Sequence, residues 1–353
     1  MRPPDIRRED LLRPLTLALI FGCAGQRLGA DEAAFFREAD PWGFILFARN
    51  IETPDQTRRL TSELRACVGR DAPVLVDQEG GRTVRLGPPR WPCFPPARAY
   101  GDLARRDPGL AGEIARLGGR LIAADLLAAG IDVDCAPVLD RPAAGAHAVI
   151  GERAYGEDVA IIVRLGRAFA EGLMAGGVAP VIKHIPGHGR ARVDSHRALP
   201  RVTTPLDELD ASDFAPFRAL ADLPMAMTAH VVFEAVDEKR PASASPLVIE
   251  DVVRRRIGFS GLLISDDLWM DALSGSLGER AGAVLAAGCD IALCCHGAPG
   301  QMAEAAAAAR PLAGLPLARA EAARADVVRD GESFDSGQAR RRFDAAFDMR
   351  FAK

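Results

Sequence analysis

Residues 261–268 read Gly-Leu-Leu-Ile-Ser-Asp-Asp-Leu, a short apolar run that ends in two carboxylates. Near-continuous hydrophobicity over about four to eight residues is typical of a strand buried on both faces. Asp266 and Asp267 follow the run directly, so we expect them at the carboxyl end of such a strand. Seven further apolar runs end in the same way, in polar or glycine-rich residues: 15–23, 43–48, 73–76, 131–139, 178–182, 225–229 and 289–295.

Segments with helical spacing lie between these runs, at 55–67, 109–129, 156–176, 205–221, 246–256 and 276–287. Alternation of strand and helix fits either an open, doubly wound sheet or a closed barrel. The polar side chains that follow the runs distinguish the two: Arg49, Asn50, Asp77, Asp140, Lys183, His184, His230, Asp266 and His296. A closed barrel brings all of them to one mouth, whereas an open sheet uses only the strand ends beside its switch point. The sequence therefore predicts a (β/α)8 TIM barrel.

The length of 353 residues suits one large domain, because α/β barrels often exceed about 250 residues. We expect a single catalytic domain over residues 1–353. In this interpretation the barrel takes up about residues 15–310, and a helical tail, 311–353, packs around it.

Charge and cysteine content narrow the class of protein. The formal net charge is −4 and no basic block occurs, so we expect no nucleic-acid partner and a small-molecule substrate. The apolar segment 15–23 is too short to span a membrane and is needed as the first strand, so we expect neither secretion nor a membrane partner. Seven cysteines without CxxC spacing suit free thiols in a reducing compartment, which predicts a cytoplasmic protein.

The densest group of reactive side chains is Lys183-His184-Ile185-Pro186-Gly187-His188-Gly189, followed by Asp194-Ser195-His196. Glycine and proline mark this segment as an irregular loop after a strand, where functional side chains are often displayed. Asp194 and His196 are two residues apart, so the carboxylate can hydrogen-bond the imidazole and fix its tautomer. Such a pair is suited to proton transfer.

Two other groups follow strands. Asp266 and Asp267 form one, and the segment 76–82, Val-Asp-Gln-Glu-Gly-Gly-Arg, with Arg85 beyond it, forms the other. Carboxylates and guanidinium groups of this kind can hold the hydroxyls of a sugar. Arg153, in the loop after the fourth strand, is a further candidate.

Structural interpretations of the same residues remain open. His188 or His296 alone is more often a hydrogen-bonded structural residue than a catalyst. Asp267 can cap the next helix and Arg82 can pair with Glu79. A zinc site made of His184, His188, Asp194 and His196 is an alternative that we disfavour, because the neighbouring proline and lysine suit substrate binding better than a rigid coordination shell.

These motifs, taken in order, resemble glycoside hydrolase family three, and within it the bacterial single-domain β-N-acetylglucosaminidases that recycle peptidoglycan. The resemblance rests on the following stretches, which lie between residues 15 and about 300: 43–50 (GFILFARN), 76–82, 136–140 (APVLD), 183–189, 194–196, 227–230 (MTAH) and 264–268. The Cys294-Cys295-His296 ending of the last strand and the tail after residue 300 depart from the family pattern.

The resemblance implies a role for each site residue. Asp266 is expected to be the nucleophile, His196 the general acid/base and Asp194 the residue that orients and tunes His196. Residues expected to hold the terminal N-acetylglucosamine are Asp77, Arg85, Arg153, Lys183 and His184. The choice of Asp266 over Asp267 comes from the resemblance, because spacing alone does not decide it.

The implied reaction is the retaining, exo-acting hydrolysis of β-1,4-linked N-acetylglucosamine from fragments such as N-acetylglucosaminyl-1,6-anhydro-N-acetylmuramic acid, with or without peptide. Retention proceeds through a covalent glycosyl-enzyme. Histidine suits the acid/base role because its ordinary pKa, about 6.5, lies near neutrality. No cofactor and no metal are expected, and we expect a monomer.

Three alternatives stay open at this stage. One is a β-glucosidase or β-xylosidase of the same family, although many of those take a carboxylic acid/base from a further domain. Another is phosphorolysis, since a neutral imidazole would not repel an incoming phosphate as a carboxylate would. The third, from a different class, is a sugar-binding barrel that has lost catalysis.

Overall fold

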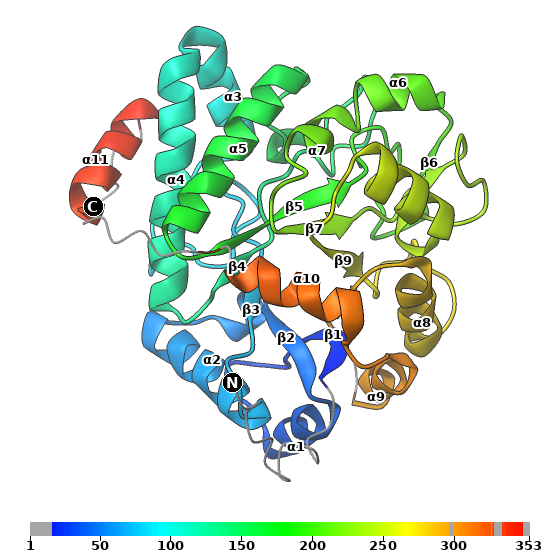
Figure 1. Ribbon diagram of the computed structural model, residues 1–353. Coiled ribbons are helices and arrows are strands. Elements are labelled where there is room, and N and C mark those ends of the chain that lie inside the picture. The colour runs from blue at the N-terminus through cyan, green and yellow to red at the C-terminus, as the bar shows by residue number, and fades with distance from the viewer. Residues whose placement is uncertain (1–15, 297–298, 326, 328–333, 349–353) are drawn as a thin grey trace, which may run out of the picture.

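A closed barrel of eight parallel strands forms the centre of the protein (Figure 1), as seen in a computed structural model that describes residues 16–296, 299–325, 327 and 334–348. The predicted (β/α)8 barrel is confirmed. The strands run around it in the order β1-β10-β9-β7-β5-β4-β3-β2. Their bounds are β1 Leu17–Gly22, β2 Pro41–Leu46, β3 Val74–Val76, β4 Val133–Asp134, β5 Ala179–Ile185, β7 Met225–Thr228, β9 Leu262–Asp267 and β10 Ile291–Cys294.

The barrel closes where the first strand meets the last. Leu19 lies opposite Ala292, and Phe21 lies opposite Cys294, in parallel register. Strand residues are buried throughout β2, β3, β5, β7 and β10. Continuous apolar runs therefore form strands here because both faces of the sheet are covered, by the barrel interior and by the helices.

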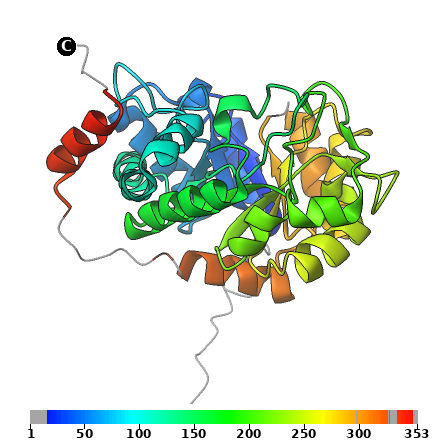
Figure 2. The same ribbon diagram turned by 90° about the horizontal axis from the view of Figure 1, so that it is seen from above.

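Helices surround the barrel (Figures 1 and 2). Their bounds are α1 Ala30–Ala39, α2 Pro54–Val68, α3 Ala97–Arg106, α4 Pro108–Ala128, α5 Val159–Ala175, α6 Leu206–Ala211, α7 Ala215–Ala219, α8 Leu277–Ala287, α9 Pro299–Ala308, α10 Gly314–Ala325 and α11 Ser336–Ala346. Short 3-10 turns occupy η1 Ala48–Asn50, η2 Gly151–Arg153 and η3 Ala242–Ala244, and η4, Val248–Arg256, is a π-helix.

The predicted helix over 205–221 is wrong in one respect, because the structure divides it into α6 and α7. The Asp213 carboxylate accepts hydrogen bonds from Arg190 and from the hydroxyl of Ser212, at 2.7 Å each. Pro216 lies in the first turn of the next helix, where the amide hydrogen that proline lacks would otherwise be needed to continue the hydrogen bonding of α6. The tertiary contact with Arg190 was invisible in the helical spacing.

Two further helices and a small sheet escaped the sequence analysis. α1 and α3 begin at Gly29 and Pro96, and neither residue provides a side-chain cap. The usual signal of a helix start is therefore missing. Strands β6 (Arg201–Val202) and β8 (Val232–Phe233) form a two-stranded parallel sheet outside the barrel. Two residues are too few to produce a recognisable alternation.

The helix α10 covers the amino-terminal end of the barrel, opposite the mouth. Its Arg319 pairs with buried Asp290 at 2.9 Å, and its Arg324 pairs with Asp71 at 2.8 Å. Both aspartates lie just before strands, β10 and β3 respectively. The lower side of the molecule in Figure 2 shows α10 in this position.

The helix α11 packs against the outside of α4 and α3 (Figure 2). Phe343 is fully buried and lies with its ring 5.7 Å from that of Phe94 and 6.2 Å from that of Tyr100. Arg340 donates a hydrogen bond of 2.8 Å to the carbonyl of Cys93. The helix therefore holds the segment around Phe94 against the barrel.

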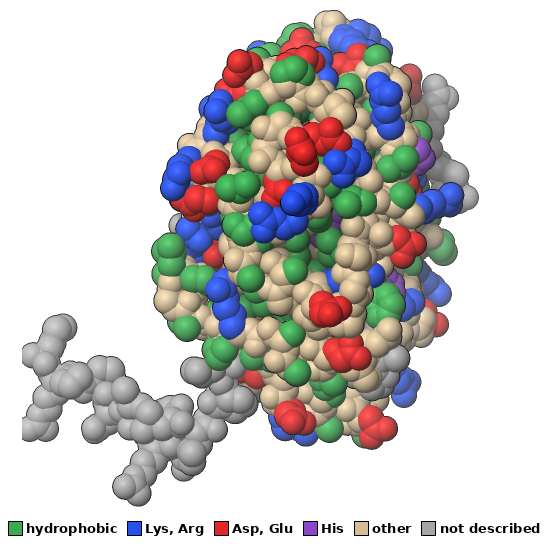
Figure 3. Space-filling model, turned by 90° about the vertical axis from the view of Figure 1, so that its right-hand side faces the viewer, with side chains coloured by type: hydrophobic (Ala, Val, Ile, Leu, Met, Phe, Trp, Pro, Cys, Tyr) green, Lys and Arg blue, Asp and Glu red, His purple; other side chains and the backbone are tan. Residues whose placement is uncertain are grey.

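The face shown in Figure 3 carries basic and acidic side chains interspersed with apolar ones, rather than gathered by sign. All seven cysteines are free thiols, as the sequence predicts. Among the described residues, no helix is long and apolar enough to cross a membrane.

Ser276→Ala is expected to lower the free energy of unfolding by about 1 kcal/mol without changing activity. Ser276 caps α8 by accepting a hydrogen bond from the amide of Glu279, whose carboxylate in turn accepts from the Ser276 amide. Urea unfolding of this variant and of a control, Ser274→Ala, measures the difference. Ser274 is exposed and lies two residues earlier in the chain. Equal midpoints for the two variants would contradict the capping role.

Candidate active site

A cavity of about 360 Å³ opens at the carboxyl ends of the barrel strands. Its walls carry cationic, anionic and apolar side chains: Ile45, Phe47, Asp77, Thr83, Arg85, Val149, Ile150, Arg153, Lys183, His184, His188, Ser195, His196, Met227, Asp266, Asp267, Met270, Leu293, Cys295 and His296. The loops after six of the eight strands contribute, and β7 adds Met227 from within the strand, which is how barrels of this type assemble their sites.

The two carboxylates at the end of β9 have different surroundings. The Asp266 carboxylate accepts a hydrogen bond from the amide of Asp267 at 2.8 Å, through one oxygen. Asp267 instead binds the amides of Cys295 and Trp269, at 3.0 and 3.2 Å. Asp267 therefore holds two backbone amides through Oδ1, and its Oδ2 lies 3.7 Å from His296 Nδ1, whereas one Asp266 oxygen has no hydrogen bond from the described residues.

Asp266 is kept ionised by its neighbours. Burial by itself would raise the pKa of its carboxyl, but His184, His230 and the Asp267 amide outweigh burial and hold that pKa below the ordinary value. His230 is fixed in turn, with Nδ1 2.6 Å from the hydroxyl of Ser243 and Nε2 3.0 Å from the carbonyl of Asp267. A partly buried, ionised carboxylate facing a cavity is suited to nucleophilic attack.

Asp194 and His196 form a hydrogen-bonded pair on the loop after β5. The Asp194 Oδ1 atom lies 2.9 Å from His196 Nδ1 and also accepts from the His196 amide at 3.0 Å. Burial would raise the pKa of Asp194, but the amide and imidazole of His196 lower it overall. With Nδ1 held by Asp194, the Nε2 atom of His196 is the nitrogen left to exchange a proton with a ligand.

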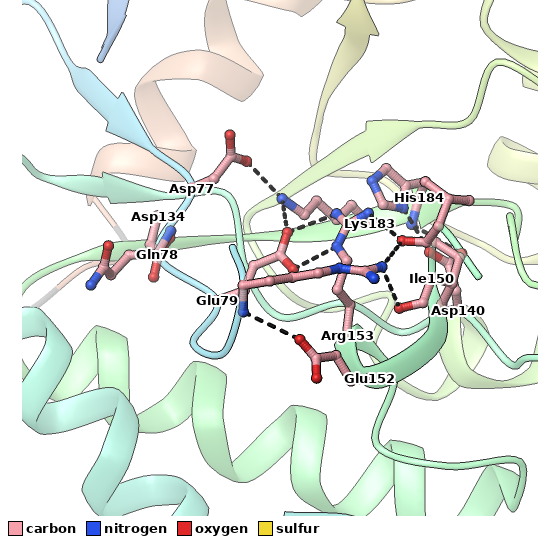
Figure 4. Close-up of polar contacts among 12 residues, drawn as sticks. Asp77, Gln78, Glu79, Asp134, Asp140, Ile150, Glu152, Arg153, Lys183 and His184 are labelled. Atoms are coloured by element: carbon pink, nitrogen blue, oxygen red, sulfur yellow. Dashed lines mark hydrogen bonds and ion pairs between the residues drawn. The ribbon is translucent and has the colours of Figure 1, made fainter. Parts of the chain in front are cut away.

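A network of alternating charges forms another wall, with the Lys183 ammonium between two carboxylates (Figure 4). Lys183 Nζ lies 2.7 Å from Asp77 and 2.7 Å from Glu79. Arg153 binds Glu79 through two hydrogen bonds of 2.8 Å, and Arg85 binds Asp77 at 3.1 Å. Each carboxylate of the network is paired with two cationic groups, and the network presents several donors and acceptors to the cavity.

Pairing outweighs burial throughout this network. Burial would raise the pKa of Asp77 and of Glu79, yet Lys183 and the arginines lower the pKa of both, that of Glu79 to about 2. Burial would lower the pKa of Lys183, but Asp77 and Glu79 raise it above the ordinary value. All three groups are therefore charged at neutral pH.

His184 is anchored by Asp140, in the loop that follows the preceding strand, β4. The Asp140 carboxylate is fully buried, lies 2.6 Å from His184 Nδ1 and accepts a 2.6 Å hydrogen bond from the amide of His188. This contact leaves the Nε2 edge of the His184 imidazole directed away from Asp140, and the ring lines the cavity.

The structure brings the predicted site residues together. The cavity is lined by Asp266, His196, Asp77, Arg85, Arg153, Lys183 and His184, while Asp194 lies behind His196 and contacts it. The suggested pairing of Arg82 with Glu79 is wrong. Arg82 donates to the carbonyls of Ala148 and Val149, because Arg153 and Lys183 already occupy Glu79.

Some residues that the sequence analysis named without assigning them a role in the site contribute to it. Glu79 and Asp140 hold Lys183 and His184, and the spacing of Asp77 and Glu79, two residues apart after one strand, was a usable signal. The sequence also did not determine the side of the cavity formed by the residues that follow the last strand. There the His296 ring lies 5.2 Å from that of Phe47, and His296 Nε2 lies 2.9 Å from an Arg49 nitrogen.

The three histidines of the disfavoured zinc site each contact a different side chain. His184 contacts Asp140, His196 contacts Asp194, and His188 contacts Ser195. Within the part of the chain that the structure describes, no three histidine, cysteine or carboxylate side chains are grouped as a metal site requires.

Acidification is expected to destabilise the fold as pH falls from about 4.5, the ordinary pKa of Glu79, to about 2. A carboxylate whose folded pKa is depressed contributes stability above its unfolded pKa and loses that contribution as pH falls through its folded pKa. Urea midpoints measured between pH 7 and pH 2 test this. Glu79→Gln should be less stable at pH 7 but lose less on acidification, and parallel curves for the two proteins would contradict the assignment.

Comparison with known proteins shows the family to which the chain belongs. Residues 27–329 match the Glycosyl hydrolase family 3 N terminal domain. A beta-hexosaminidase of Bordetella avium (strain 197N) is 38% identical over 294 residues, covering 82% of this chain and 83% of that protein. A beta-hexosaminidase of Methylococcus capsulatus (strain ATCC 33009 / NCIMB 11132 / Bath) is 41% identical over 281 residues, with 78% and 82% covered.

Solved structures give the same result. NagZ from Neisseria gonorrhoeae superposes with a TM-score of 0.82 at 33% identity, over 95% of this chain and 97% of that one. Its complex with N-trifluoroacetyl-D-glucosamine gives a TM-score of 0.81 at 33% identity, over 94% and 96%. The resemblance read from the sequence is confirmed, and the chain belongs to glycosyl hydrolase family 3 and is a glycoside hydrolase.

Proposed function

We propose that the protein is a retaining exo-β-N-acetylglucosaminidase that removes a terminal, β-1,4-linked N-acetylglucosamine. The observation that carries this proposal is that Asp266 and the Asp194-bound His196 face one small cavity together with the Asp77–Lys183–Glu79–Arg153 network. A volume of about 360 Å³ is at the lower end for small-molecule sites, and it suits a single terminal sugar better than a chain running through.

In the first step, an Asp266 carboxylate oxygen attacks C1 of the bound sugar. The bond from C1 to the leaving oxygen breaks, and His196 Nε2 gives its proton to that oxygen. A covalent glycosyl ester on Asp266 results. Asp194 orients His196 for the transfer, because its charged carboxylate is in contact with Nδ1.

In the second step, water attacks C1 from the side that the leaving group vacated. His196 takes a proton from the water, the ester bond to Asp266 breaks, and the sugar leaves with its β configuration retained. Asp77, Arg85, Arg153, Lys183 and His184 hold the sugar during both steps, and no cofactor is needed.

The substrate class rests on the relatives. Related proteins carry the name beta-hexosaminidase, and one solved neighbour binds N-trifluoroacetyl-D-glucosamine. We extend this to N-acetylglucosaminyl-1,6-anhydro-N-acetylmuramic acid fragments of peptidoglycan, with or without peptide, handled by a cytoplasmic monomer.

The test compares hydrolysis of 4-nitrophenyl β-N-acetylglucosaminide, β-glucoside and β-xyloside, each with and without a chelator. We expect strong preference for the first, unaffected by the chelator. Preference for the glucoside or xyloside would move the specificity within the family, and loss of activity with chelator would favour a metal-dependent reaction. Sugar 1-phosphate among the products in phosphate buffer would identify phosphorolysis.

A further inference from the structure

The serine between Asp194 and His196 is buried although its neighbours are not. Ser195 is 2% exposed, whereas the side chains of Asp194 and His196 are 20% and 65% exposed. The acid/base candidate thus stands on an exposed part of the loop, and Ser195 is the residue of the three that is packed into the protein.

Ser195 makes one contact on each side of the cavity. Its hydroxyl lies 2.9 Å from His188 Nε2, at the end of β5. Its carbonyl accepts a 3.2 Å hydrogen bond from the amide of Ala272, in the loop that follows the strand carrying Asp266. The acid/base loop is therefore joined through one residue both to the sugar-binding side and to the nucleophile side of the site.

His188 is itself rigidly held. Its amide donates a 2.6 Å hydrogen bond to Asp140, and its ring packs edge-on against His184 with centroids 5.8 Å apart. Burial and the adjacent His184 lower the pKa of His188 to about 4, so the imidazole is neutral at neutral pH and keeps one donor and one acceptor nitrogen.

The second ring nitrogen of His188 shows how much the ring depends on its contact with Ser195. His188 Nδ1 is buried and has no hydrogen-bond partner among the described residues. A buried polar atom without a partner is unfavourable. The contact of Nε2 with Ser195 is the hydrogen bond that the ring makes among the described residues, so its loss would leave both ring nitrogens without a partner there.

We propose that His188 and Ser195 are positioning residues that fix the loop bearing Asp194 and His196, and thereby set the distance from His196 to Asp266. The proposal rests on the acid/base role proposed above for His196. Neither side chain transfers a proton. Their hydrogen bond restrains the peptide between the two members of the dyad, so its loss should impair proton transfer more than sugar binding.

The experiment measures how the rate depends on the leaving group. A 4-nitrophenolate departs with little help from an acid, whereas an alkyl alcohol needs the proton. For Ser195→Ala and His188→Leu we expect kcat/KM on an alkyl β-N-acetylglucosaminide to fall by about 10- to 100-fold. This is part of the rate enhancement of about 10²–10⁴-fold that a general acid/base provides. On the nitrophenyl substrate we expect kcat/KM to fall by less than about threefold. Added azide should raise their kcat and give a β-glycosyl azide, since azide needs no general base.

Three further variants make the result decisive. His188→Gln retains an amide group near the position of Nε2 and should recover most of the lost rate. Val193→Ala, at a 41% exposed side chain of the same loop, should behave as the wild type. His196→Ala should show the same leaving-group dependence as Ser195→Ala in a stronger form.

An equal fall on both substrates for Ser195→Ala and His188→Leu, or no difference between His188→Gln and His188→Leu, would overturn the positioning role. If His196→Ala shows the dependence and these variants do not, the positioning proposal fails while the proposed function stands. If His196→Ala shows no such dependence, the acid/base assignment fails instead.

Discussion

Asp266→Ala is expected to lower kcat on 4-nitrophenyl β-N-acetylglucosaminide by about 10⁴-fold or more, the scale seen when a catalytic nucleophile is removed. The carboxylate is ionised and offers an oxygen to the cavity, so its loss removes the covalent route. The fold should persist, because the carboxylate accepts only one hydrogen bond from the described residues. Steady-state rates and circular dichroism measure the two effects.

Azide gives this prediction a stereochemical check. In Asp266→Ala an azide ion can enter the space of the missing carboxylate and attack C1 from that side, so the product should be the α-glycosyl azide. Asp267→Asn is the matched comparison, because an amide oxygen can still accept from the Cys295 backbone. A loss in Asp267→Asn as large as that in Asp266→Ala, or full activity in Asp266→Ala, would reject the assignment of the nucleophile.

Lys183→Met is expected to reduce the free energy of unfolding by about 3–5 kcal/mol, because it leaves two buried carboxylates without their shared cation. The ammonium is 2% exposed and lies 2.7 Å from both Asp77 and Glu79. The same loss should lower kcat/KM by about 10²-fold or more, mainly through KM, since a wall of the sugar site loses its charge balance. Urea unfolding and substrate titration measure the two quantities.

The chain offers a matched control for this substitution. Lysine occurs only at positions 183, 239 and 353, and Lys239 is exposed. Lys239→Met should change the free energy of unfolding by less than about 0.5 kcal/mol and leave kcat/KM unchanged. If Lys183→Met were no more harmful than Lys239→Met, the network in Figure 4 would not contribute as described.

The barrel could be predicted because its strands are encoded locally. Runs such as 178–182 are apolar throughout, and each ends in polar residues, so both the strand and the direction of its functional end can be read from a few positions. Features that depend on distant partners could not be predicted in this way. The break between α6 and α7 depends on Arg190 reaching Asp213, and α1 and α3 begin without capping side chains.

The same distinction between local and distant determinants applies to the residues of the site. Residues at strand ends, such as Asp77 and Lys183, could be chosen because barrel geometry brings all strand ends together. Their pairings could not, since Arg82 is only three residues from Glu79 in the sequence, whereas the fold pairs Glu79 with Arg153, 74 residues away. Likewise, spacing treated Asp266 and Asp267 as equivalent, and the backbone amides that occupy Asp267 distinguish them.

The packing of α11 reaches the sugar site from outside the barrel. Phe343 supports Phe94, whose carbonyl accepts a 2.9 Å hydrogen bond from the amide of Gly81, two residues after Glu79. A protease that cleaved the chain just before α11 would break no bond near the cavity. Dissociation of α11 would nevertheless remove Phe343 from Phe94, and with it the support for the turn that carries Glu79. Such a cleavage on the far side of α4 should then weaken binding of the sugar more than it lowers the rate of bond cleavage.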